Sequence, residues 1–218
     1  ILNTIRIPTI CDRRFLTNFY PGLKIKGSKN GIGSKVFISW EKPGVRRGGS
    51  IEALARLRPV FNAKGSVTAG NSSQTSDGAA FVMVVSERML KELGVEPIAR
   101  LKSYHVSGLD PKIMGVGPLY AIPEALKRAG LQQSDIDLIE LNEAFASQCL
   151  YSRDALEIDP EIYNVNGGSI SIGHPFGMTG SRLTGHILRE LKRREKKYGI
   201  VSMCIGGGMG AAGLFEAC

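Results

Sequence analysis

The pattern of hydrophobic and polar positions changes from irregular to periodic along this chain. In residues 1–43, glycines and a pair of arginines interrupt short apolar pieces, and neither a helical nor a strand period is sustained. We assign this segment no function and expect either a divergent covering loop or sequence altered by truncation of an ancestral gene. Residues 44–218 carry clear periods and are expected to form one domain.

Helices are expected where apolar residues recur every three or four positions. Ser50 is a plausible N-cap, and Gly94 and Gly130 each follow a helical pattern as a C-terminal stop. The predicted helices are 51–57, a segment ending at Leu93, 118–129, 143–156 and 178–197.

Strands are expected in the apolar or alternating runs between these helices, at 79–85, 98–106, 136–141, 200–204 and 211–215. The first run is apolar throughout, which predicts a buried strand. Helices and strands alternate until two strands close the chain, and we find no internal repeat. This order predicts an α/β fold, a layered domain in which helices cover a mixed sheet.

Composition is that of an ordinary globular domain, because 218 residues with 43% hydrophobic and 22% charged positions can bury a core. The net charge of +8 raises the question of nucleic acid, but the basic residues are scattered except for a run over 192–197. That run ends a predicted helix, where cations complement the helix dipole. Aromatic residues are few, so we expect no nucleic-acid partner. A positive field would also suit a phosphate-bearing coenzyme.

The four cysteines, Cys11, Cys149, Cys204 and Cys218, show no paired spacing and no C-x-x-C motif. This pattern argues against a disulfide framework or a zinc site, so we expect no metal and a reducing compartment. No apolar run has the length of a membrane span, and residues 1–10 lack the order of a signal peptide. We therefore expect no membrane partner and a cytoplasmic location, or an organelle matrix such as the peroxisome.

Three chemically capable side chains follow or end predicted strands. Asn142 comes directly after one strand, His174 lies among glycines before the longest helix, and Cys204 ends a strand before a glycine-rich loop. Ligand crevices of open α/β sheets form at such strand ends. Each residue alone has an ordinary explanation: a helix cap for Asn142, packing near a helix start for His174, a buried thiol for Cys204. Three together favour a site.

The motifs around these residues resemble the signature segments of the thiolases. They are Asn-Glu-Ala-Phe at 142–145, Gly-His-Pro at 173–175 and Cys-Ile-Gly-Gly-Gly-Met-Gly at 204–210. Segments 69–73 and 76–78 fit the same family. The resemblance runs from about Gly44 to the last residue and implies the C-terminal half of the thiolase fold, which consists of two such halves about a pseudo-twofold axis.

What the resemblance implies is an acyltransferase that cleaves 3-ketoacyl-CoA with CoA, or runs the reverse Claisen condensation, through an acylated cysteine. Cys204 would be the acid/base at the α-carbon, for which nearby positive charge or backbone donors could bring a thiol pKa close to working pH. His174 would donate to the thioester oxygen and help to activate the nucleophile. Asn142 would hold a water in the same oxyanion hole, and the N–H of Gly206 would contribute to the other.

For coenzyme A, expected as a co-substrate with no bound cofactor, the resemblance also implies contacts. Ser73, with Ala69 and Gly70, would line the pantetheine arm. Arg46 would lie near the adenine nucleotide. Met114 and Phe145 would form the wall of the acyl pocket. A surface arginine is an equal alternative for Arg46, and a core role is nearly as good for Met114 and Phe145.

One element of a thiolase is missing from these 218 residues, namely the nucleophilic cysteine in a Cys-Ser/Ala-Ser-Gly setting. Cys11 is followed by Asp-Arg-Arg, which does not match. We therefore expect the chain alone not to turn over and to need a complementary thiolase N-terminal chain, or to form a homo-oligomer. Segment 72–77 favours a β-oxidation member. The alternatives are a non-catalytic acyl-CoA-binding or partner-binding module, and a truncated inactive remnant.

Overall fold

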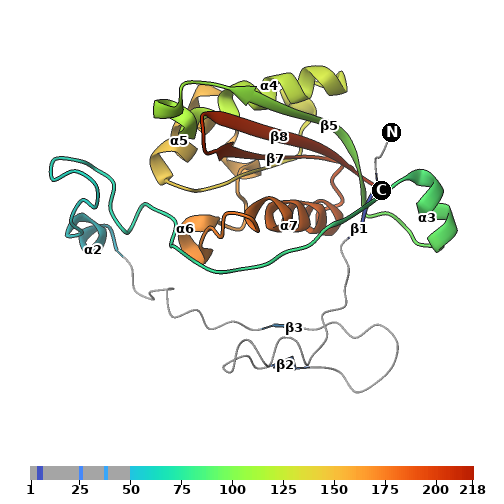
Figure 1. Ribbon diagram of the computed structural model, residues 1–218, viewed down its shortest axis with the longest axis horizontal. Helices are drawn as coiled ribbons and strands as arrows, with labels where there is room; N and C mark the ends of the chain where they lie inside the picture. The colour runs from blue at the N-terminus through green and yellow to red at the C-terminus, as the bar shows by residue number, and fades with distance from the viewer. Residues whose placement is uncertain (1–3, 7–24, 27–36, 39–49) are drawn as a thin grey trace.

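The computed structural model describes residues 4–6, 25–26, 37–38 and 50–218 (Figure 1). The early strands are β1 (Thr4–Arg6), β2 (Ile25–Lys26) and β3 (Phe37–Ile38), of which β2 and β3 pair with each other. From residue 50 the elements are α2 (Ile51–Ala55), β4 (Met83–Val85), α3 (Glu87–Leu93), β5 (Ala99–Gly108), the 3₁₀ helix η1 (Pro111–Val116), α4 (Pro118–Ala129), η2 (Gln133–Asp135), β6 (Leu138–Leu141), α5 (Ala146–Ala155), η3 (Pro160–Ile162), α6 (Ser169–Ile172), α7 (Thr179–Arg193), β7 (Tyr198–Ile205) and β8 (Met209–Ala217).

The main sheet has the strand order β4-β1-β5-β8-β7-β6. Only β6 and β7 are parallel, and the other pairs are antiparallel, so the sheet is mixed. Helices α4 and α5 lie on one face of the sheet, and α6 and α7 lie on the other (Figure 1). The predicted layered α/β fold is therefore confirmed. Within the described ranges, no helix is long and apolar enough to cross a bilayer.

Strand β7 is buried on both faces, and its alternating side chains divide the core in two. Ile200 packs in the cluster beneath α4, whereas Val201 packs in the cluster beneath α7. The predicted stripe of α7 supplies most of the second cluster, with Leu183, Ile187 and Leu191 almost completely buried. Burying each such side chain stabilises the fold by about 1.5–3 kcal/mol. This packing holds α7 against the sheet and so fixes the position of its N-terminus.

The element boundaries were predicted least well near the edge of the sheet and near the site. The buried strand expected over 79–85 is wrong in extent, because β4 is a three-residue edge strand and Phe81 is 77% exposed. Helix α5 starts at Ala146 rather than at 143, since Phe145 is extended and pairs with Ser72. The short helix α6 was not expected in the glycine-rich segment.

Candidate functional site

Asn142 is fixed at the end of β6 by its backbone. Its N–H donates to the carbonyl of Ser202 on β7 (3.0 Å), and its carbonyl accepts from Nε2 of Gln148 (2.9 Å). The residue is completely buried. It does not cap α5, whose N-cap is Phe145. The helix-cap explanation of Asn142 is therefore wrong, and its side chain instead contacts Ser169 and His174.

His174 lies between α6 and α7, and its ring has a defined hydrogen-bond partner. Nδ1 lies 2.6 Å from Oγ1 of Thr179, and that hydroxyl donates to the carbonyl of Pro175 (2.9 Å). Because the single hydroxyl proton is committed to Pro175, Thr179 must accept from Nδ1–H. The neutral ring then carries its proton on Nδ1 and a lone pair on Nε2.

The charge state of this ring follows from its surroundings. Burial lowers the pKa of His174 below its ordinary value, and the positive charge of Arg182 lowers it further. The imidazole is therefore neutral at neutral pH and can accept a proton at Nε2. A ring in that state is suited to act as a general base.

Asn142 and His174 lie close together in space. Nδ2 of Asn142 lies 3.2 Å from Nε2 and 3.4 Å from Nδ1 of His174, so the amide faces the part of the ring between its two nitrogens. These residues are 32 positions apart in the sequence. The close approach of Asn142 and His174 is what the arrangement at strand ends predicted.

Cys204 lies at the same end of the sheet through strand pairing. It is two residues beyond Ser202, which accepts from Asn142, and it precedes the turn that contains Gly206. Burial raises the pKa of the Cys204 thiol. The expected shift of this pKa toward working pH is therefore wrong for the described chain, and the thiol keeps its proton at neutral pH. Gly206 is exposed in this turn.

Ser73 and Phe145 border the same region. The N–H of Ser73 donates to the carbonyl of Ala144 (2.9 Å), and the N–H of His174 donates to the carbonyl of Gln74 (3.3 Å). Segment 71–74 therefore runs beside segment 144–146 and touches the histidine loop. The half-buried ring of Phe145 contacts Phe61 edge-on, with 6.2 Å between the centroids.

The remaining predicted residues have different positions. Met114 is half-buried in η1, next to Gly115, where an added Cβ would lie 3.1 Å from Gln148, the residue that supports Asn142. Gly70 packs against α2 and the residues after it, because an added Cβ would lie 2.6 Å from Leu54. Ala69 is exposed. Arg46 lies outside the described residues.

Four residues that support the site were not found from the sequence: Thr179, Ser169, Arg182 and Asn164. Asn164 accepts from the N–H of Leu141 at Oδ1 (2.8 Å) and donates from Nδ2 to the carbonyl of Leu141 (2.9 Å). One buried amide thus completes the hydrogen bonding of the last residue of β6. Single polar residues of this kind give no periodic signal; only the positive φ of 45° at Asn164 fits a known preference of asparagine.

Replacing Asn164 by alanine is expected to lower the free energy of unfolding by about 2–4 kcal/mol, because two buried backbone groups lose their partner and alanine tolerates positive φ poorly. Asn166→Ala, which removes an exposed amide two residues further on, is the matched control and should change stability by less than about 0.5 kcal/mol. Urea unfolding of the three proteins measures both values. Equal midpoints for Asn164→Ala and Asn166→Ala would contradict this account.

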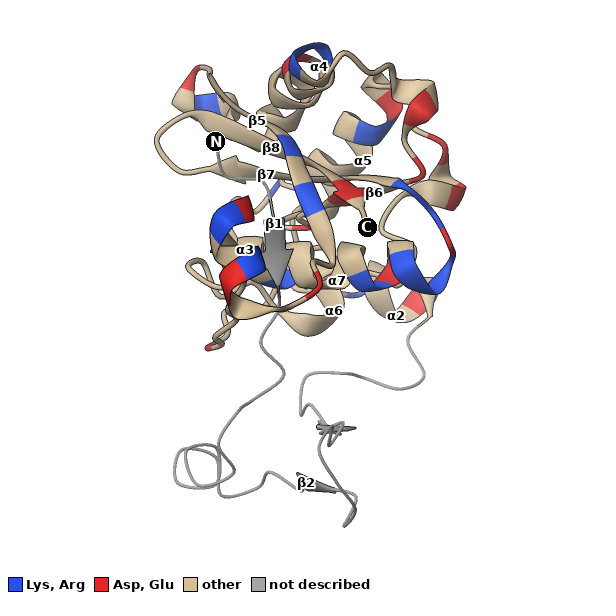
Figure 2. Cartoon of the chain, turned by 90° about the vertical axis from the view of Figure 1, so that its right-hand side faces the viewer, with Lys and Arg blue, Asp and Glu red and all other residues tan. Residues whose placement is uncertain are grey.

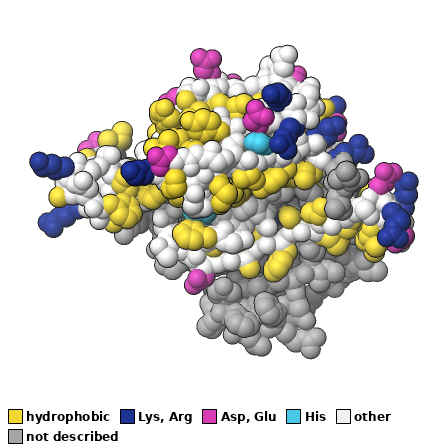
Figure 3. Space-filling view, turned by 45° about the horizontal axis from the view of Figure 1, so that its top comes forward, with side chains coloured by type: hydrophobic (Ala, Val, Ile, Leu, Met, Phe, Trp, Pro, Cys, Tyr) yellow, Lys and Arg dark blue, Asp and Glu magenta, His cyan; other side chains and the backbone are white. Residues whose placement is uncertain are grey.

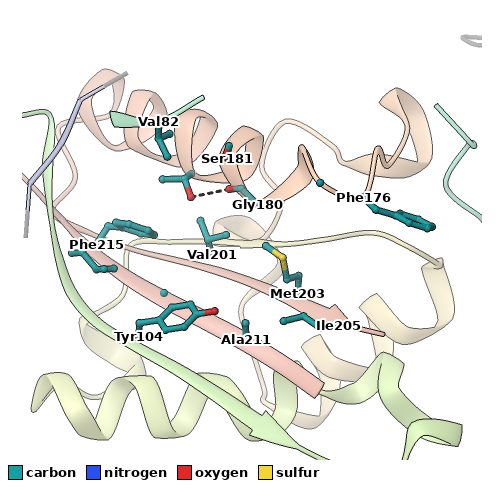
Figure 4. Close-up of a pocket in the computed structure, with 14 residues that line it drawn as sticks. Val82, Tyr104, Phe176, Gly180, Ser181, Val201, Met203, Ile205, Ala211 and Phe215 are labelled. Carbon is teal, nitrogen blue, oxygen red and sulfur yellow. Dashed lines mark hydrogen bonds between the residues drawn. The ribbon is translucent and has the colours of Figure 1, made fainter. Parts of the chain in front are cut away.

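An apolar cavity of about 430 Å³ opens on the α7 face of the sheet. In Figure 4, Gly180 and Ser181 of α7 border it on one side, and Val201, Met203, Ala211 and Phe215 of β7 and β8 form its floor. Phe176, two residues after His174, lies at its rim and is 88% exposed. The cavity therefore begins beside the histidine loop and continues along an uncovered part of the sheet.

Residues 95–217 match the family model for the thiolase C-terminal domain. The chain belongs to the thiolase family. A second match, to the thiolase N-terminal domain, covers residues 26–88 and so begins inside the segment to which we assigned no function. The family models thus divide the chain between residues 88 and 95, and the boundary that we placed between 43 and 44 stays a prediction.

Similar proteins of known name are 3-ketoacyl-CoA thiolases. The chain is 53% identical over 184 residues to that of Bacillus subtilis, covering 84% of this chain and 47% of the relative. It is 53% identical over 192 residues to the human peroxisomal protein, covering 88% of this chain and 44% of the relative. The chain thus spans about half the length of these relatives and resembles an acyltransferase enzyme.

Solved structures agree with this assignment. The human mitochondrial 3-ketoacyl-CoA thiolase in complex with CoA is 45% identical, with a TM-score of 0.76 over 83% of this chain and 46% of that one. The Bacillus anthracis acetyl-CoA acetyltransferase is 43% identical, with a TM-score of 0.79 over 94% of this chain and 52% of that one. The observed fold is that of one half of a thiolase.

Proposed function

We propose that this chain supplies one half of the active site of a 3-ketoacyl-CoA thiolase, which cleaves 3-ketoacyl-CoA with CoA or runs the reverse condensation. The observation that carries the proposal is the contact between Asn142 and a neutral His174 whose Nδ1 is committed to Thr179. This arrangement leaves one ring nitrogen to accept a proton and one amide N–H group to bind a water or an oxygen.

In the proposed reaction, Nε2 of His174 takes the proton of a nucleophilic thiol that the complementary N-terminal half supplies. The thiolate attacks the 3-keto carbon, and the bond between C2 and C3 breaks. The acyl group stays on the nucleophile, and the electron pair passes to the enolate of acetyl-CoA. Cys204 gives its proton to C2, for which a raised thiol pKa is suitable in this direction.

The oxyanion positions complete the proposal. The imidazolium formed at His174 would donate from Nε2 to a thioester oxygen, and Asn142 would hold a water at the same oxygen. The N–H of Gly206, an exposed residue, would serve the other oxyanion. In the second half of the reaction, the Cys204 thiolate would take the proton of the CoA thiol, and the CoA thiolate would attack the acyl carbon. The nucleophile would leave as a thiolate and take back its proton from the His174 imidazolium.

The coenzyme contacts are proposed along the segment beside the histidine loop. Ser73 belongs to segment 71–74, which runs next to segment 144–146. The backbone of Ser73 is therefore close to Phe145 and to His174. Ala69 and Gly70 would extend this border along the pantetheine arm, and Met114 with Phe145 would wall the acyl chain. Arg46 would lie near the nucleotide. The CoA complex of the human mitochondrial relative supports coenzyme A as the ligand.

In this proposal, the remainder of a thiolase N-terminal half covers the apolar surface that is exposed in this chain. The cavity beside α7 and the exposed Ile51, Phe61 and Phe81 leave much hydrophobic surface open. Figure 3 shows hydrophobic side chains gathered in a band over one face. Lys and Arg, in contrast, are spread over several elements with acidic residues among them (Figure 2). Without that half, self-association into a homo-oligomer is expected to cover the same face.

Fatty-acid β-oxidation is the proposed setting, as the names of the peroxisomal relatives support fatty-acid metabolism. The compartment stays a prediction, because the relatives include both a bacterial and a peroxisomal protein. A cytoplasmic location and an organelle matrix are both consistent with the proposed reaction.

Thiolysis is the direct test. The purified chain is assayed with acetoacetyl-CoA and a longer 3-ketoacyl-CoA, alone and after mixing with a separately expressed thiolase N-terminal half. We expect no turnover by the chain alone and thiolysis on mixing, with the two chains eluting together from a sizing column. Turnover at a normal rate by the chain alone would contradict the proposal. A stable mixed complex without turnover would favour a non-catalytic binding module.

A further inference from the structure

A hydrogen-bond chain leads from α7 to the buried amide of Asn142. Nη2 of Arg182 donates to Oγ of Ser169 (3.0 Å), and Oγ of Ser169 donates to Oδ1 of Asn142 (2.6 Å). Ser169 is completely buried, as is Asn142. The three residues come from α7, α6 and the end of β6, so the chain joins three elements at the site.

The direction of this chain is fixed by the kinds of group in it. A guanidinium has only donors, so Ser169 must accept from Arg182. The single hydroxyl proton of Ser169 then points at Asn142, and the atom of Asn142 that it meets must be an acceptor. The amide is thereby held with Oδ1 toward Ser169 and with Nδ2 toward His174.

We propose that Ser169 and Arg182 are positioning residues that set the orientation of the Asn142 amide, so that its N–H group and not its oxygen faces His174. A reversed amide would put an acceptor against the ring and remove the donor from the place where a substrate oxygen or water would bind. The consequence for catalysis rests on the proposed function, whereas the orientation itself is a property of this chain.

The electrostatic setting supports this role. Burial lowers the pKa of Arg182, while the charges of Glu140 and Glu143 act in the opposite direction and favour the guanidinium form. Glu143 also accepts from the N–H of Ile170 in α6 (3.3 Å). The helix that carries Ser169 is therefore held to the Asn-Glu-Ala-Phe segment at a second point, which keeps Ser169 within reach of Asn142.

The test uses NMR of the chain labelled with ¹⁵N-histidine, which contains three histidines. Ser169→Ala removes the hydroxyl but keeps the charge of Arg182. Once the amide can rotate, its oxygen can face the ring and stabilise a ring N–H, so the pKa of His174 should rise by a measurable fraction of a unit. Ser152→Ala is the matched control, because Ser152 is equally buried and its hydroxyl has no hydrogen-bond partner among the described residues.

Two further variants keep the test decisive. Ser169→Thr retains the hydroxyl and should leave the titration of His174 as in the original chain. Ser169→Gly removes the same hydroxyl without changing any charge and should raise the pKa of His174 as well; it serves if Ser169→Ala does not fold. A folded Ser169→Ala chain whose His174 titrates as before would overturn the proposal.

Kinetics of the mixed enzyme give the second readout. Ser169→Ala should lower kcat by about ten- to a hundredfold, part of the loss typical of removing an oxyanion donor, with little change in KM, and Ser152→Ala should change neither. If the unsubstituted mixture shows no thiolysis, the proposed function fails, and the NMR titration still decides the orientation. An unchanged kcat in an active Ser169→Ala mixture would contradict a positioning role.

Discussion

Replacing His174 by alanine is expected to lower kcat for thiolysis in the mixed enzyme by about 10³-fold or more. The substitution removes the proposed base for the nucleophile, a contribution of about 10²–10⁴-fold. It also removes the proposed oxyanion donor, worth about 10²–10³-fold. The two effects act through one ring and need not multiply.

The control for this prediction is His105→Ala. His105 lies in β5, within the antiparallel pairing to β8, and belongs to none of the thiolase motifs. The His105→Ala enzyme should keep kcat within about twofold of the original, as expected for a partly buried position away from the reacting groups. Loss of activity to the same extent in both variants would mean that His174 acts through folding and not through chemistry.

The second large effect concerns the turn that follows Cys204. Gly210, at the start of β8, lies so close to Gly117, at the start of α4, that an added Cβ would meet the backbone of Gly117 at less than van der Waals distance. Both partners are backbone, so no side chain can move aside. We expect Gly210→Ala to lower the free energy of unfolding by about 3 kcal/mol, at the upper end of overpacking costs.

Gly108→Ala is the matched control for this turn, because Gly108 pairs with Met209 beside Gly210 on the next strand and an added Cβ there meets nothing within 4 Å. It should not lower stability, since alanine at an unstrained glycine position reduces the entropy of the unfolded chain. Urea midpoints at one protein concentration compare the two variants. A Gly210→Ala midpoint equal to that of Gly108→Ala would show that this contact is not tight.

The sequence predicted the layered fold because hydrophobic patterns that extend over many residues are kept when the elements pack together. Helix 118–129 is observed with those bounds, and the stripe of α7 is buried as expected. The failures occur where tertiary contacts override local pattern. Phe145 is extended and outside the helix because it pairs with Ser72, and Phe81 is exposed because β4 lies at the sheet edge.

For the site, motifs identified the residues that face one another but not those that hold them. Asn142 and His174 were found because they lie in glycine-rich or strand-end segments. Ser169 and Thr179 were missed, since a serine in a glycine-rich stretch and a threonine at a helix start have ordinary local explanations. The direction of a hydrogen bond depends on which donors and acceptors meet in three dimensions, and that information is not local in sequence.

The measurement that tests the central claim most directly is the location of the acyl group. The mixed enzyme is incubated with acetyl-CoA, quenched in acid, and the intact mass of each chain is determined. We expect one acetyl group on the N-terminal half and none on this chain, because we propose that the acid/base residues lie here and that the other half supplies the nucleophile. An acetyl group on Cys204, or on any other cysteine of these 218 residues, would contradict that division of roles.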